Sequence, residues 1–111
     1  MYKKRIMIDL DGVLNNYTHF DENFIPEIKV GAKEFLQSLY DTNEYELLLF
    51  TTRNKILVAK WLMKNNIDIY FKDITNIKEP AFVYLDDRAV QFSGDYTDTM
   101  NQIKKFQTYW K

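Results

Sequence analysis

Three short apolar runs constrain the fold of this 111-residue chain more than any other feature. They occupy residues 6–8, 47–50 and 82–85, and each is continuous rather than alternating with polar residues. Continuous runs of this length are typical of strands that are buried on both faces of a sheet. We therefore expect a central sheet with both faces covered.

Segments with helical periodicity separate these runs. In residues 30–40 the apolar side chains recur at the spacing of an amphipathic helix. After the second run, Asn54 can cap another helix. The apolar face of that helix carries Val58, Trp61 and Leu62. Helices placed between strands in this way predict crossover connections within one sheet.

The last third of the sequence predicts one more strand and a final helix. Residues 67–71 are interpreted as a short strand, and a helix from about Asp98 onward is marked by Ile103, Phe106 and Trp110. The order is then β-α-β-α-β-β-α. Such alternation predicts an α/β fold of three layers, in which helices flank a central parallel sheet and the crossovers are right-handed.

Composition limits the size and chemistry of the protein. The chain has the length of a single domain, 1–111, and its 46% hydrophobic residues are enough for a packed core. A net charge of -1 provides no overall basic field for a nucleic-acid backbone. With no cysteine and only His19, thiolate chemistry, cysteine-ligated zinc and a Ser-His-Asp triad are disfavoured. No apolar run approaches a membrane span or a signal peptide, so we expect a cytoplasmic protein.

Polar side chains follow each apolar run at the point where the strand should end. The sequences are Asp-Leu-Asp-Gly at 9–12, Thr-Thr-Arg at 51–53 and Asp-Asp-Arg at 86–88. Because ligands of open α/β sheets bind beyond the carboxyl ends of the strands, these groups should converge on one edge. Four carboxylates in one place are costly unless a cation neutralises them, and oxygen ligands without imidazole or thiolate favour Mg²⁺. A site for Mg²⁺ and a phosphorylated substrate is therefore predicted.

In these motifs the sequence resembles the haloacid dehalogenase superfamily of phosphohydrolases. The strand and Asp-x-Asp-Gly motif is matched at 6–14, the strand ending in Thr at Thr51, and the strand ending in paired Asp at 86–87. Lys78 is the best candidate for the lysine that precedes the last motif, with Lys72 as the alternative. The resemblance covers residues 6 to 87 and implies a single HAD-like core domain with a Rossmann-like sheet.

The resemblance also implies a mechanism. Asp9 would be the nucleophile and form an aspartyl-phosphate, and Asp11 would protonate the leaving oxygen and then activate water. Mg²⁺ would be held by the Asp9 carboxylate, the Asp11 backbone carbonyl and Asp86. Thr51 and Lys78 would bind the phosphoryl oxygens.

Four further candidate residues lie next to these motifs. Asp87 either reaches the metal through water or orients Lys78. Thr52 and Arg53 are candidate substrate-binding residues. Arg53 and Arg88 could contact a second anionic group of the substrate, and a structural ion pair is the equal alternative for each.

The intervals between the motifs are too short for a folded cap domain, so the site should be open on one side. Residues 15–24 form the expected flap. Within it, Tyr17 and Phe20 offer aromatic surface for a base or sugar, His19 is expected to be exposed, and Phe24 is expected to anchor the flap to the core.

The resulting hypothesis is a Mg²⁺-dependent phosphomonoester hydrolase that acts on a nucleotide or a nucleic-acid end. A sugar-phosphate phosphatase and a phosphotransferase would use the same residues. A phosphate-binding regulatory module with little turnover is the alternative from another class. An open site of this kind resembles those of relatives that act on bulky substrates or borrow a lid from a neighbouring subunit, so a homo-oligomer is compatible with it.

Overall fold

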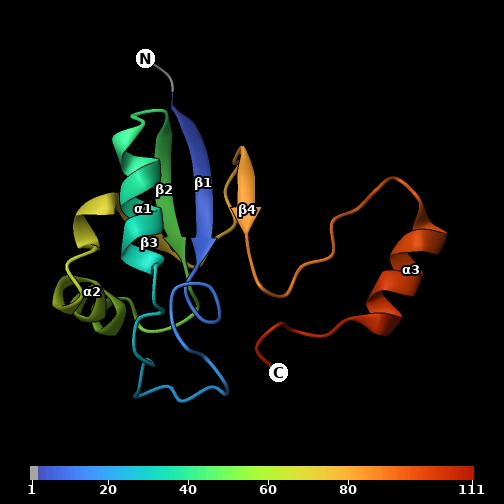
Figure 1. The fold of residues 1–111 in the computed structure, drawn as a ribbon, viewed down its shortest axis with the longest axis horizontal. Helices are drawn as coiled ribbons and strands as arrows, with labels where there is room; N and C mark the ends of the chain where they lie inside the picture. Colours follow the sequence, from blue (N-terminus) through green and yellow to red (C-terminus); the bar gives the residue numbers. More distant parts are fainter. Residues whose placement is uncertain (1–2) are drawn as a thin grey trace.

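The computed structural model describes residues 3–111, which form an α/β fold around one sheet (Figure 1). In chain order the elements are β1 (Lys4–Asp9), α1 (Ala32–Asp41), β2 (Tyr45–Phe50), α2 (Lys55–Lys64), the short 3₁₀ helix η1 (Asp68–Tyr70), β3 (Phe71–Thr75), β4 (Val83–Leu85) and α3 (Tyr96–Lys105). In residues 3–111 no helix is long and apolar enough to cross a membrane.

The sheet has four parallel strands in the order β3-β2-β1-β4. The central strand β1 pairs with β2 on one side and with β4 on the other, so that Ile8 lies between Leu49 and Leu85. All carboxyl ends therefore meet at the same edge, which we call the carboxyl edge. The predicted fold class, a Rossmann-like parallel sheet flanked by helices, is confirmed.

The main core lies between the sheet and the helices α1 and α2. Alternate residues of β1 and β2 enter it, together with the inner faces of both helices. Its fully buried members include Ile8, Leu36, Leu49, Val58 and Leu62. On the opposite face of the sheet Met7 and Leu48 are also buried, and the β3–β4 connection contacts this face through the Glu79 amide, which donates to Met7 Sδ at 3.3 Å.

The predicted strand at 67–71 is wrong. Ile67 and Tyr70 are buried in the core as parts of a 3₁₀ turn, whose spacing of three residues brings both onto one side. The strand itself is the next segment, Phe71–Thr75. β3 carries the exposed polar residues Lys72 and Asp73 in its middle, so it lacks the apolar run that marks the other strands.

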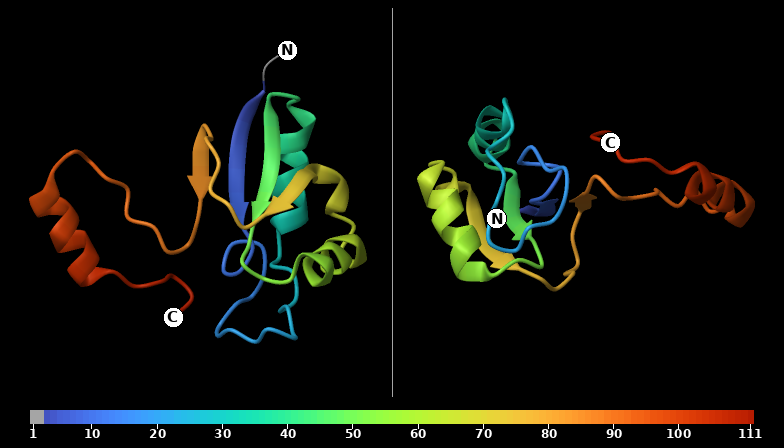
Figure 2. Two further views of the ribbon diagram at one scale, coloured as in Figure 1. Left: turned by 180° about the vertical axis from the view of Figure 1, so that it is seen from behind. Right: turned by 90° about the horizontal axis from the view of Figure 1, so that it is seen from below.

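The final helix was predicted in the right place but not with the right end. It is capped by Asp95, whose carboxylate accepts from the amides of Thr97 and Asp98. It ends at Lys105, because Phe106 is extended, so Phe106 and Trp110 lie beyond it. None of the residues of α3 is buried, and the helix stands away from the sheet beyond β4 (Figures 1 and 2).

The expectation that both faces of every strand would be covered is also wrong at β4. Val83 is 44% exposed and Tyr84 is 42% exposed, and these neighbouring side chains point to opposite faces of the sheet. The helix that follows β4 in the chain, α3, has no buried residue and stands away from this edge strand.

Candidate functional site

Three carboxylates meet at the carboxyl edge of the sheet. Asp9 is the last residue of β1, and Asp86 and Asp87 directly follow the neighbouring strand β4. One carboxylate oxygen from each lies within 4.8 Å of the others. Adjacent parallel strands that end at the same level thus bring together residues almost 80 positions apart in sequence; of the four carboxylates that the strand-end pattern predicted here, these three form the group.

The environment of Asp9 raises its pKa from the ordinary 3.8 to about 8. Burial is the largest cause, followed by a hydrogen bond with the Asp87 side chain and by the negative charges of Asp86, Asp87 and Asp11. An uncompensated group of carboxylates therefore retains a proton near neutral pH. A divalent cation with a preference for oxygen ligands would relieve the same repulsion, and the donor set of Asp9, Asp86 and Asp87 fits Mg²⁺.

Asp11 does not belong to this group of three carboxylates. Its own carboxylate is instead held by two other side chains. Arg53 donates through Nε to one oxygen at 2.8 Å, and Asn15 donates through Nδ2 to the other at 3.0 Å. Asn15 is fully buried and also accepts from the Gly12 amide at 3.1 Å. The turn after β1 is thereby fixed around Asp11.

The prediction that Arg53 contacts substrate is not supported by its position. Its side chain is 1% exposed, is paired with Asp11, donates to the Asp21 carbonyl at 2.6 Å and stacks against Phe20. A guanidinium buried in this way ties the flap to the end of β2, and its Nε and Nη1 are already engaged by Asp11 and the Asp21 carbonyl. The structure thus places Arg53 in the structural ion pair, the other alternative for this residue.

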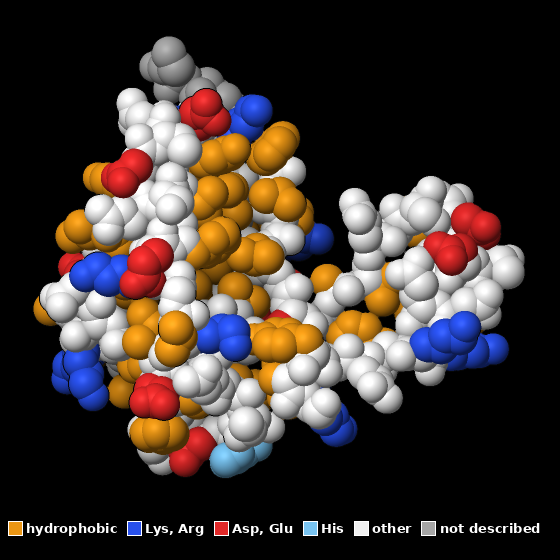
Figure 3. All heavy atoms as spheres, in the orientation of Figure 1, with side chains coloured by type: hydrophobic (Ala, Val, Ile, Leu, Met, Phe, Trp, Pro, Cys, Tyr) orange, Lys and Arg blue, Asp and Glu red, His pale blue; other side chains and the backbone are white. Residues whose placement is uncertain are grey.

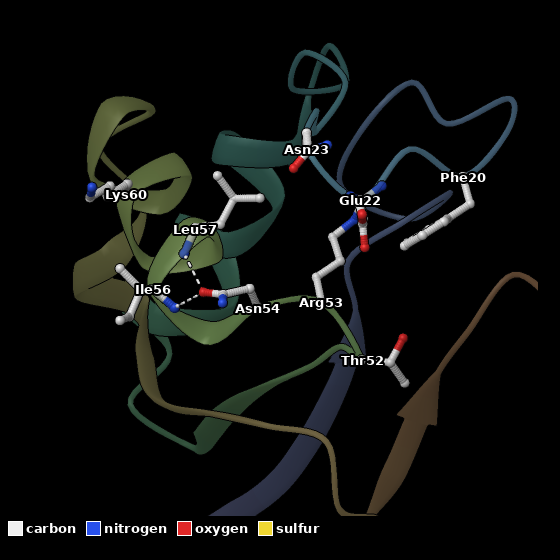
Figure 4. Close-up of a pocket in the computed structure, with 9 residues that line it drawn as sticks. All are labelled: Phe20, Glu22, Asn23, Thr52, Arg53, Asn54, Ile56, Leu57 and Lys60. Atoms are coloured by element: carbon white, nitrogen blue, oxygen red, sulfur yellow. Dashed lines mark hydrogen bonds between the residues drawn. The ribbon is translucent and has the colours of Figure 1, made fainter.

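The two threonines after β2 face different surroundings. Thr51 is buried, its amide donates to the Thr75 carbonyl, and its hydroxyl accepts from the Arg53 amide at 3.1 Å. Thr52 is exposed and lines a hollow of about 540 Å³ between the flap and the start of α2, together with Phe20 (Figure 4). Asp9 and Asp86 line a different cavity, so Thr52 is not placed with them.

Lys78 lies in the cavity that contains the acidic residues. This cavity of about 650 Å³ is lined by Asp9, Asp86 and Lys78 as well as by aromatic side chains that include Tyr84. The Lys78 ammonium lies 4.6 Å from the centre of the Tyr84 ring. Lys72 instead pairs with Glu46, near the start of β2 and far from the carboxyl edge. Of the two candidate lysines, Lys78 is therefore the one that lines the same cavity as Asp9.

The end of the chain is an unpredicted part of the site. Trp110 donates its indole N–H to the Asp87 carboxylate at 2.5 Å, and the Tyr109 hydroxyl donates to the Gly12 carbonyl. The Trp110 ring also contacts Tyr17 edge-on, with 5.2 Å between ring centres, and lies 5.1 Å from the Arg88 guanidinium. Sequence patterns indicated Trp110 only as a helix residue, because nothing local predicts that the chain returns to β1.

Gly12 is required where these segments meet. Its backbone φ of +83° lies in the region that residues other than glycine rarely adopt. A Cβ at this position would lie 2.1 Å from Asp87 Oδ2 and 2.9 Å from Trp110 Nε1. The glycine of the first motif thus allows the turn after Asp9 and the close approach of both groups.

The flap differs from expectation in its anchor. Phe24 is 61% exposed, so the prediction that it enters the core is wrong; its neighbour Ile25, at 8% exposed, does so instead. The Pro26 carbonyl then accepts from the Trp61 indole at 3.1 Å, which fixes the flap to α2. His19 is exposed, as expected.

Fold and site together define an α/β protein with a carboxylate cluster at the carboxyl edge of a parallel sheet. No protein-family model and no curated protein matches the sequence. Among solved structures, the chain is similar to a conserved protein from Bacteroides thetaiotaomicron, with 20% identity and a TM-score of 0.61 over 97% of this chain and 95% of that one. At this identity the likeness shows the fold alone.

Proposed function

We propose that this protein is a Mg²⁺-dependent phosphomonoester hydrolase that uses Asp9 as its nucleophile. The observation that carries the proposal is the group of Asp9, Asp86 and Asp87 at the carboxyl edge, beside a cavity that Asp9, Asp86 and Lys78 line together. Such a set combines a nucleophile, metal ligands and a cation for phosphoryl oxygens.

In the proposed reaction an Asp9 oxygen attacks phosphorus, and the bond from phosphorus to the ester oxygen breaks. The departing oxygen takes a proton, and water then hydrolyses the aspartyl-phosphate to restore the carboxylate and release phosphate. Bound Mg²⁺ would neutralise negative charge between the carboxylates and the phosphate, held by Asp9, Asp86 and Asp87. Lys78 would stabilise the phosphoryl oxygens during transfer.

Asp11 would move the protons in this scheme, as the resemblance implies. In the structure both of its oxygens have partners, Arg53 and Asn15. Proton transfer therefore requires Asp11 to turn one oxygen away from a partner and toward the leaving group. Arg53 would control that rotation.

The two contacts of Asp11, with Arg53 and Asn15, favour a second candidate function, a phosphate-binding module with little turnover. If Asp11 never leaves Arg53 and Asn15, the site can bind Mg²⁺ and phosphate without supplying the proton that turnover needs.

A nucleotide or nucleic-acid end is the proposed substrate class of the hydrolase, since the cavity combines its charged end with the rings of Phe50 and Tyr84. A phosphotransferase would use the same residues.

The proposal is tested by phosphate release with Mg²⁺ from p-nitrophenyl phosphate, nucleotides, sugar phosphates and phosphorylated oligonucleotides. The wild type is run beside Asp9→Asn, which keeps the shape of the side chain and removes the nucleophile. Metal-dependent turnover by the wild type alone is the expected result. Binding of Mg²⁺ without turnover would favour the binding module, and equal turnover by both proteins would exclude Asp9 as the nucleophile.

A further inference from the structure

The chain after β4 forms an arm, residues 88–108, that leaves the carboxyl edge and returns to it. At its start, Asp87 belongs to the acidic cluster, and at its end Tyr109 and Trp110 bind the Gly12 carbonyl and Asp87. Thr108 is buried at the point of return. Helix α3 is thus the middle of an excursion tied at both ends, and it projects from the body of the protein (Figures 1 and 2).

Helix α3 has the features of a helix that packs against something. Its N-cap Asp95 is hydrogen-bonded, Asp98 lies in the first turn and two lysines lie in the last turn, all of which stabilise a helix. Its apolar stripe is nevertheless open to solvent: Tyr96 is 81%, Met100 54% and Ile103 57% exposed. A ten-residue helix is marginal in water without a partner for such a stripe.

A matching apolar surface lies between α1 and β4, and we call it the β4 patch. Val83 and Leu85 of β4 pair with Ile6 and Ile8 and therefore share the face of the sheet that α1 covers. With Phe35 and Leu39 of α1 they make up the patch. Leu39 and Leu85 are partly buried against the core, whereas Phe35 and Val83 are 42% and 44% exposed. Figure 3 shows hydrophobic side chains gathered on this face between α1 and β4. In a covered parallel sheet a helix would occupy this position.

The arm cannot place its own α3 on the β4 patch in the usual way. A helix that covers a parallel sheet begins near the carboxyl edge and ends near the opposite edge, as α1 does before β2. Only two residues separate the end of α3 at Lys105 from the buried Thr108, so the two ends lie within about 10 Å of each other. The last turn of α3 therefore stays near the carboxyl edge. A second copy is not subject to this restriction.

We propose that two copies of this chain exchange their arms, with α3 of each copy packing on the β4 patch of the other. Exchange of identical elements about a two-fold axis buries the apolar stripe of both helices and both β4 patches at once. The stripe and the patch together hide roughly 600 Å² for each arm, or about 1,200 Å² for the pair, which reaches the lower end of specific interfaces. This assembly does not depend on the proposed enzymatic function.

The absence of cysteine from the sequence makes the exchange directly testable. Two single variants, Val83→Cys and Ile103→Cys, are purified separately, mixed and oxidised, so that a disulfide between them can form only between copies. Asn101→Cys is the matched control, because residue 101 is exposed on the side of α3 away from the stripe. The mass of the unmodified protein is measured by light scattering across a dilution series.

The expected results are a dimer mass at micromolar concentration and a Val83–Ile103 cross-link at least about tenfold more abundant than with Asn101→Cys. The variant Ile103→Asp should remain folded, since its side chain is more than half exposed in the single copy, and should weaken dimerisation about 100-fold. A monomer at all concentrations would overturn the proposal. Equal cross-linking of Val83→Cys by Ile103→Cys and by Asn101→Cys would also overturn it. The same holds if a double variant that carries both Val83→Cys and Ile103→Cys forms the disulfide only within one chain.

Discussion

Replacing Asp9 by Asn should remove a pH-dependent destabilisation of the metal-free protein. The folded protein holds a proton on Asp9 up to about pH 8, whereas the unfolded chain loses it near 3.8. Between these values the folded state binds more protons, so the free energy of unfolding falls as pH rises, by at most about 1.4 kcal/mol per pH unit. The Asn side chain stays neutral and can still donate to Asp87, so the variant should lack this slope.

The magnitude follows from the same shift. From pH 5 to pH 8 the upper limit is about 4 kcal/mol, and because Asp9 is only partly buried, solvent screening should reduce the effect to about 2 kcal/mol. For a domain of this size that corresponds to roughly 10 °C in Tm. Between pH 5 and pH 8 the Tm of the wild type should thus fall by about 10 °C more than the Tm of Asp9→Asn.

The assay is thermal unfolding in chelator at pH 5, 6, 7 and 8, repeated with Mg²⁺. Magnesium should raise the wild-type Tm most at pH 8, where Asp9 is most easily deprotonated, and should have a weaker effect on Asp9→Asn. The control is Asp73→Asn: the pKa of this exposed carboxyl is lowered, mainly by a hydrogen bond from the Ile74 amide, so any contribution is lost only in acid. Parallel pH profiles for wild type and Asp9→Asn would refute the reasoning.

Three further substitutions test the surroundings of Asp9. Gly12→Ala should destabilise the protein by about 3 kcal/mol in denaturant unfolding, against about 1 kcal/mol for Gly31→Ala, because both have positive φ but only Gly12 has atoms where the Cβ would lie; equal losses would contradict this. Trp110→Phe should weaken Mg²⁺ binding about 10-fold in a calorimetric titration, since Asp87 loses its indole donor, and unchanged affinity would exclude that role. Lys78→Ala should reduce phosphate release at least about 100-fold while Lys72→Ala leaves it unchanged; the reverse would reassign the phosphate-binding lysine.

The parts of the fold and site that could be predicted are those encoded by local pattern. The apolar runs that end in Asp9 and Asp86 identify both strands, and parallel pairing then brings their ends together without further information. The capping side chain of Asn54 likewise marked the start of α2. In each case the signal lies within a few residues of the feature that it predicts.

The remainder depends on contacts that no local pattern encodes. The middle of β3 is polar and exposed, so no apolar run marks this strand, and its pairing with β2 is a property of the whole sheet. Phe24 and Ile25 are adjacent and both apolar, so only the path of the flap decides which one is buried. The position of Trp110 beside Asp87 depends on the return of the arm.

The contact between Trp110 and Asp87 links the end of the chain to the site as one thermodynamic system. A ligand that prefers one arrangement of Asp87 must change the fraction of molecules in which the tail is docked, and docking of the tail must change the affinity for that ligand by the same factor. Because the tail also ends the arm, an exchange of arms would extend this reciprocity to assembly. Dilution of the protein would then alter ligand affinity, although no residue of one copy need touch the ligand of the other.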